Sequence, residues 1–145
     1  MIRVKIANQQ EAVPLDFARL RETARVVLEG EQIKEAEISL AFVDNSTIHR
    51  LNKQFLNHDE PTDVLSFPLS APNARKLEGE IVIGAEVAKV QAEERGHDVG
   101  AELALYVIHG LLHLCGYDDH EPDDIKRMRE SERYFLRELG YPAIS

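Results

Sequence analysis

The spacing of apolar residues along this chain changes between the alternation of a strand and the three- and four-residue repeat of a helix. Residues 2–6 alternate apolar with basic side chains, which predicts a half-buried strand. Residues 17–29 repeat apolar side chains at helical spacing, and Asp16 can cap this helix while Gly30 ends it. We expect its core-facing side chains to be Phe17, Leu20, Ala24, Val27 and Leu28.

The rest of the chain continues to mix the two patterns. Three more strands are predicted from short apolar runs at residues 37–43, 64–67 and 80–83. Four more helices are predicted: one between Asp44 and Pro61, and others over residues 86–95, over residues 101–114 and from Pro122 onward. The order β-α-β-α-β-β-α-α-α predicts an α+β fold in a single domain, residues 1–145, with a small sheet covered by helices.

The helix predicted over residues 101–114 is apolar on almost every side, yet it carries two histidines. His109 and His113 are four residues apart, so they stack on one face of the helix. Both imidazoles need partners, because an unsatisfied buried polar group costs about 1–3 kcal/mol. After a glycine the chain turns back to a third histidine, His120. This layout predicts a metal ion held by His109 and His113 on a central, buried helix and by His120 after the turn.

Three neutral ligands leave a fourth coordination position for water, which distinguishes a catalytic metal site from a closed structural one. Histidine ligands favour one divalent ion, Zn²⁺ first, although nickel, copper and iron are also compatible with them. Zinc lowers the pKa of a bound water to about 7. Asp118 and Asp119 lie in the turn. They either orient a ligand histidine or accept a proton from that water, or they form a solvated acidic turn.

The residue after the first histidine argues against a peptidase. Zinc peptidases of the HExxH type carry a glutamate there as general base, whereas this chain has Gly110. A peptidase would therefore lack its proton acceptor. The glycine indicates instead that another part of the backbone approaches the helix closely.

The charge of the chain gives two opposing indications about a nucleic-acid partner. The net charge of −9 argues by itself against a nucleic-acid partner. Arginines nevertheless recur at four-residue spacing on the last predicted helix, at Arg129, Arg133 and Arg137. These arginines either pair with glutamates on a solvated face, namely Glu130, Glu132 and Glu138, or guide an RNA strand.

Three features predict a cytoplasmic protein without a membrane partner. The longest apolar run is too short to span a bilayer. The first ten residues lack the apolar core and cleavage site of a signal peptide. Cys115 is the single cysteine, so the chain can form no internal disulfide, and we expect it to be a small buried apolar residue.

The sequence HGLLHLCGYDDH at residues 109–120 resembles the YbeY family, together with PTDVLSFP at 61–68, GEIVIG at 79–84 and the pair Leu51-Asn52. The resemblance covers nearly the whole chain. It implies an α+β fold with a small mixed four-stranded sheet and about five helices. It also implies a metal-dependent, single-strand-specific endoribonuclease that acts in 16S rRNA 3′-end maturation and ribosome quality control. The implied partners are ribosomal RNA and the ribosome, and DNA is not expected.

The resemblance also implies site residues. It assigns metal ligands to His109, His113 and a third histidine six residues after the second, where this chain has Asp119. Either the turn carries one extra residue and His120 binds, or the carboxylate of Asp119 coordinates. We predict His120, because turns absorb single insertions readily. Asp119 and Asp63 are then the catalytic candidates, and the role of Asp63 rests on the resemblance alone.

A second departure concerns an arginine that members commonly carry after the aromatic residue of the LNxx(Y/F) segment. Leu56 stands there in this chain, which removes a bidentate donor to a phosphoryl oxygen. The candidate substitutes are Arg50, Lys53, Asn57 and His58. The alternative function is therefore a ribosome-associated assembly factor with a mainly structural metal and little nuclease activity.

Overall fold

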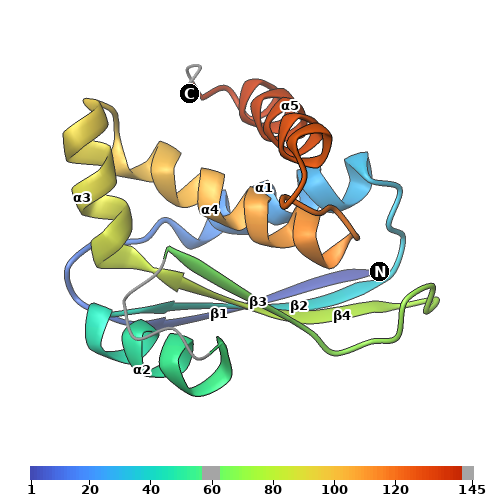
Figure 1. Cartoon of the computed structure of the whole chain (residues 1–145), viewed down its shortest axis with the longest axis horizontal. Coiled ribbons are helices and arrows are strands. Elements are labelled where there is room, and N and C mark those ends of the chain that lie inside the picture. Colours follow the sequence, from blue (N-terminus) through green and yellow to red (C-terminus); the bar gives the residue numbers. More distant parts are fainter. Residues whose placement is uncertain (57–62, 142–145) are drawn as a thin grey trace.

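The computed structural model describes residues 1–56 and 63–141 of the chain (Figure 1). The strands in these ranges are β1 (Ile2–Gln9), β2 (Ala36–Val43), β3 (Val64–Pro68) and β4 (Leu77–Gly84). The helices are α1 (Phe17–Gly30), α2 (Asn45–Leu56), α3 (Ala85–Arg95), α4 (Val99–Leu114) and α5 (Pro122–Glu138). The predicted order of elements and the α+β class are confirmed.

The four strands form one mixed sheet in the order β1-β2-β4-β3. The first three strands of that order run parallel, and β3 runs antiparallel to β4 at the edge. Val64 on β3 pairs with Ile83 on β4, and the N–H of Gly84 donates to the carbonyl of Asp63 at 2.8 Å. This pairing holds Asp63 beside the C-terminal end of β4, where α3 begins.

Helices cover the sheet unequally. In Figure 1, α4 lies directly on one face with α1 and α3, α5 lies beyond α4, and α2 lies on the opposite face. The core between α4 and the sheet consists of fully buried apolar side chains, among them Ile38, Leu40, Ile81, Ile83, Ile108 and Leu111. The smaller core under α2 holds Val43, Ile48, Leu65 and Val82. The prediction that the histidine helix is central and packs on the sheet is confirmed. None of the described helices is both long and apolar enough to cross a membrane.

Gly110 is a point at which α4 approaches the sheet closely. A Cβ atom built on Gly110 would lie 2.8 Å from Cγ2 of Ile81 and 3.2 Å from Oγ of Ser66. The Ser66 hydroxyl donates to the Gly110 carbonyl at 3.2 Å, which joins β3 to α4 beside His109. The close approach predicted from this glycine is therefore present. It leaves no room for the glutamate that an HExxH peptidase carries at this position.

One predicted core residue is wrong. Phe17 is 40% exposed, because it lies in the first turn of α1, where the Arg21 guanidinium stands 5.9 Å from its ring centroid. The other core positions predicted on this helix are buried: Leu20, Ala24, Val27 and Leu28. The predicted cap is present as well, since Asp16 accepts the N–H of Arg19 at 3.1 Å.

Candidate metal centre

His109 and His113 project from the same face of α4, as their spacing predicts, but they are not fully buried. Their side chains are 25% and 29% exposed. The two Nε2 atoms lie 3.0 Å apart, and the rings meet edge to face with centroids 4.6 Å apart. Both imidazoles therefore direct the same ring nitrogen toward one point at the C-terminal end of α4.

The turn after α4 is held by backbone and side-chain hydrogen bonds. Gly116 takes the left-handed conformation, with φ of 101°, and the N–H of Tyr117 then donates back to the Leu112 carbonyl at 3.0 Å. The Tyr117 carbonyl lies 3.0 Å from Nδ1 of His113, while the Tyr117 hydroxyl donates to Glu31, the C-cap residue of α1, at 3.2 Å. These contacts fix both the ring of His113 and the path of the chain that follows.

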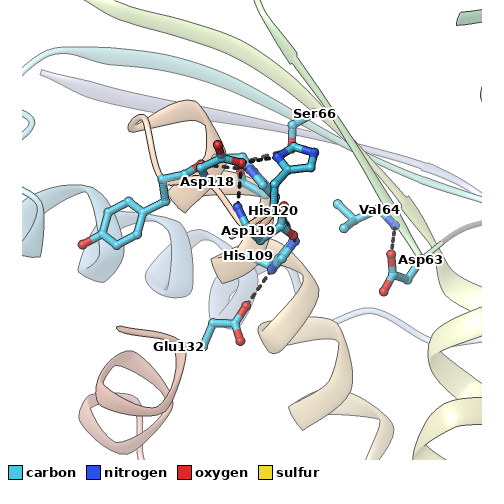
Figure 2. A network of polar contacts seen from close by, with 11 residues as sticks. Asp63, Val64, Ser66, His109, Asp118, Asp119, His120 and Glu132 are labelled. Atoms are coloured by element: carbon cyan, nitrogen blue, oxygen red, sulfur yellow. Dashed lines mark hydrogen bonds and ion pairs between the residues drawn. The ribbon is translucent and has the colours of Figure 1, made fainter. Parts of the chain in front are cut away.

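Beyond this turn the side chains alternate between the interior and the solvent. Asp119 points inward, and its Oδ2 lies 3.4 Å from Nε2 of His113 and 3.6 Å from Nε2 of His109. His109, His113 and Asp119 thus form a three-residue cluster whose potential ligand atoms face one another. Figure 2 shows Asp119 and His109 on the same side of the turn.

The structure does not bring the predicted third ligand, His120, into this cluster; its ring forms a separate possible ligand group with Asp118 and Asp119. The His120 side chain is 82% exposed and pairs with Asp118 on the outer side of the turn (Figure 2). The reason is the alternation of side chains in an extended segment, which sends Asp118 and His120 outward when Asp119 points inward. The hydrogen bond between the two lowers the pKa of Asp118 and raises the pKa of His120. We expected the turn to bulge by one residue so that His120 could bind, but the side chains of this segment alternate regularly.

Glu132 is a site residue that the sequence analysis did not assign to the metal centre. Its Oε2 lies 2.6 Å from Nδ1 of His109, so α5 supplies a carboxylate behind the ring (Figure 2). In proteins, such a partner fixes the orientation of a metal-binding histidine and increases its basicity. The sequence signal that could have identified Glu132 is its place on the helix. It lies four residues from both Met128 and Leu136, which are buried. A glutamate on the core-facing side of an amphipathic helix requires a partner.

The hydrogen bonds identify the protonation states of the two rings. A carbonyl only accepts, so Nδ1 of His113 carries a proton, and in the neutral ring its Nε2 presents a lone pair. His109 must then donate through both nitrogens, to Glu132 and to His113. Burial opposes protonation of His109, but the hydrogen bond to Glu132 and the charges of Glu132, Asp63 and Asp119 outweigh it and raise its pKa. A metal ion would displace the proton between the two rings.

The donor atoms fit a divalent metal ion. In a tetrahedral site, bonds of about 2.0–2.1 Å place the ligand atoms about 3.3–3.4 Å from one another. The three separations in the cluster, 3.0, 3.4 and 3.6 Å, lie close to that value. Two imidazoles and one carboxylate are ligands that zinc accepts, and they leave a fourth position open. Cys115 is not part of this set, and burial raises the pKa of its thiol to about 11.

A cavity of about 610 Å³ opens beside the cluster and includes His109 and Asp119 in its wall. Its volume is in the range of small-ligand sites. Asp63, the second predicted catalytic residue, lines the same cavity, and its carboxylate accepts the N–H of Val64 at 2.8 Å. The structure therefore brings Asp63 and Asp119 to one cavity.

The far end of this cavity contains a buried carboxylate. Glu102 on α4 is fully buried and lies 2.5 Å from Nε2 of His97 and 3.4 Å from Nη1 of Arg95. Burial and the hydrogen bond to Glu102 raise the pKa of Tyr106. Glu102 is therefore matched by basic neighbours, as a buried charge must be.

The residues proposed to replace the family arginine do not line this cavity where they can be placed. Arg50 and Lys53 belong to α2, which covers the opposite face of the sheet from α4. Asn57 and His58 lie outside the described residues. A cationic group facing the cavity must be sought on other elements.

Glu132→Gln is expected to weaken metal binding about 10- to 100-fold, the usual cost of removing an outer carboxylate partner. The amide keeps the shape of the side chain but loses the charge that raises the basicity of His109. The measurement is competition for zinc with a chelating dye. Glu130→Gln is the matched control, because Glu130 is an exposed residue of the same helix and does not line the cavity. Equal zinc affinities for the two variants would contradict the role assigned to Glu132.

Comparisons with known proteins agree with this architecture. A family model described as endoribonuclease YbeY matches residues 5–140. A protein named endoribonuclease YbeY from Myxococcus xanthus is 44% identical over 150 residues, covering 99% of this chain and 50% of that protein. One of the same name from Carboxydothermus hydrogenoformans is 38% identical over 138 residues, covering 94% of this chain and 96% of the relative.

A solved structure shows the same likeness. The solution structure of a Thermotoga maritima protein superposes with a TM-score of 0.69 at 31% identity, covering 96% of this chain and 89% of the other. This chain spans half the length of the Myxococcus relative and nearly all of the Carboxydothermus relative. With a family match over nearly its whole length, this chain belongs to the endoribonuclease YbeY family.

Proposed function

We propose that this protein is a metal-dependent endoribonuclease that cleaves single-stranded RNA, in 16S rRNA 3′-end maturation and ribosome quality control. Its relatives are named endoribonucleases. The observation that carries the proposal is the convergence of His109, His113 and Asp119 beside a cavity whose wall includes His109 and Asp119. The single-strand preference and the ribosomal substrate rest on the family resemblance.

His109, His113 and Asp119 would hold one divalent ion, Zn²⁺ first. When bound, the ion supplies Lewis-acid polarisation of a phosphoryl oxygen and lowers the pKa of a water molecule. Glu132 and the Tyr117 carbonyl hold the two rings so that both Nε2 atoms face the ion. In this arrangement Asp119 is the third ligand, in place of His120. It therefore does not have the proton-accepting role that was predicted for it from the sequence.

Asp63 is then the candidate proton acceptor of the site. It lines the cavity with His109 and Asp119, and its negative charge contributes to the raised pKa of His109, so it lies within electrostatic reach of the cluster. Its backbone is held by the pairing of β3 with β4, because its carbonyl accepts the N–H of Gly84 at 2.8 Å. A carboxylate anchored on a sheet edge can accept a proton without changing the position of the ligands.

The proposal is tested with zinc-loaded and metal-stripped protein on single-stranded and duplex RNA of the same sequence. We expect cleavage of the single strand by the zinc-loaded protein alone. Full cleavage by thoroughly stripped protein would rule out the metal-dependent mechanism. If metal removal lowers the melting temperature while the loaded protein leaves RNA intact, the protein is instead an assembly factor with a structural metal.

A further inference from the structure

Two arginines of α5 line the cavity that includes His109 and Asp119 of the metal cluster in its wall. Arg129 and Arg133 are one helical turn apart, and both side chains are exposed. Glu132, which contacts His109, lies between them in the sequence, on the cavity-lining face of the same helix. Both arginines therefore lie within one helical turn of Glu132, the residue that positions His109.

Three acidic residues of this cavity, Glu102, Glu132 and Asp119, have basic neighbours of their own. Glu102 is bound by Arg95 and His97, Glu132 by His109, and Asp119 lies beside both histidines of the cluster. These three carboxylates are therefore matched by Arg95, by His97 and by the histidines of the cluster. They do not require Arg129 or Arg133 as counter-ions.

Arg129 and Arg133 form no ion pair with any carboxylate in the ranges 1–56 and 63–141. The pairing with neighbouring glutamates that the sequence allowed is not observed there. Glu132 binds His109, and Glu138 accepts a hydrogen bond from the Tyr134 hydroxyl at 3.1 Å. Both guanidinium groups remain available to an anion that enters the cavity.

The anion that suits this arrangement is a phosphodiester. Arginine binds phosphate oxygens through two parallel hydrogen bonds, and its charge persists at any physiological pH. A protein of net charge −9 needs a local concentration of positive charge to hold a polyanion near its active site.

We propose that Arg129 and Arg133 bind a backbone phosphate of the RNA strand next to the linkage that is cleaved. This proposal rests on the proposed nuclease function and names the residues that position its substrate. Arg95, on the α3 side of the cavity, is not assigned this role because its guanidinium is bound to the buried Glu102. Arg129 and Arg133 are positioning residues in this arrangement, and neither is a metal ligand.

The test is the double variant Arg129→Gln/Arg133→Gln in the zinc-loaded, full-length protein. Binding is measured by fluorescence anisotropy with a 2′-O-methylated single-stranded RNA oligonucleotide, whose integrity is checked on a gel. Cleavage of the unmodified strand supplies kcat and KM separately. Arg137→Gln is the matched control, because Arg137 is exposed on α5 but does not line the cavity. Elemental analysis verifies that all variants retain zinc.

We expect the double variant to bind the oligonucleotide at least about tenfold more weakly, with KM raised by a similar factor and kcat little changed. The slope of log affinity against log salt should fall by about 0.7 for each phosphate that the variant no longer neutralises. The lysine pair Arg129→Lys/Arg133→Lys should restore the salt slope but only part of the affinity, because lysine cannot bind in a bidentate manner.

The outcomes separate this proposal from the nuclease function. If the parent cleaves RNA and the glutamine pair binds and cleaves like Arg137→Gln, the arginine subsite is wrong and the nuclease function stands. If the parent binds the oligonucleotide through these arginines but never cleaves, they bind RNA phosphate as proposed, but the nuclease function fails and with it their placement beside a cleaved linkage. A parent that does not bind the oligonucleotide at all overturns the subsite as well.

Discussion

His113→Ala is expected to abolish both metal binding and RNA cleavage. The Nδ1 proton of His113 is committed to the Tyr117 carbonyl at 3.0 Å, so its Nε2 lone pair is directed at the cluster. Losing this ligand leaves only His109 and Asp119. The affinity for zinc should then fall by more than the roughly 10–100-fold that the loss of an outer partner costs. The measurements are elemental analysis after dialysis and the rate of RNA cleavage.

The folded state of this variant must be examined alongside its activity. An ion that binds only the native protein stabilises it, so His113→Ala should lose the increase in melting temperature that zinc produces in the parent. The metal-free melting temperatures of the two proteins should differ much less, because the His113 side chain is partly exposed. His49→Ala is a control, since His49 lies on α2 at the other face of the sheet. Stoichiometric zinc in dialysed His113→Ala would refute the cluster as the metal site.

The second large effect is a contrast between two adjacent residues. Asp119→Ala should lose zinc and cleavage, because its carboxylate faces both Nε2 atoms, at 3.4 and 3.6 Å. His120→Ala should retain zinc, because its side chain is 82% exposed and pairs with Asp118. Asp119→His should also retain zinc, since an imidazole can replace the carboxylate as a ligand. The zinc content of the three variants, prepared identically, is the measurement.

The opposite contrast would restore His120 as the third ligand. If His120→Ala loses zinc while Asp119→Ala keeps it, the turn must rearrange on binding so that His120 replaces Asp119. The surface pair of Asp118 and His120 would then have to separate. An Asp118→Asn variant would weaken that pair and make the rearrangement easier.

Much of the fold could be predicted because its signals are local. The alternation in residues 2–6 and the helical repeat after Asp16 depend only on neighbours along the chain, and both elements are present. The prediction failed at Phe17, where helical spacing indicated burial but the first turn of α1 lies open to solvent. Spacing defines which face of a helix is apolar, but it does not define where along the helix the core begins.

By itself the sequence determined that two histidines share one face of a buried helix, that Gly110 lies against another element, and that a turn follows. These properties depend on backbone periodicity within single elements. Only the tertiary structure decided that Asp119 faces the histidines, that Glu132 supports His109, and that two arginines of α5 line the same cavity. Such contacts join residues from separate elements, and their formation depends on how α4, α5 and the turn pack together.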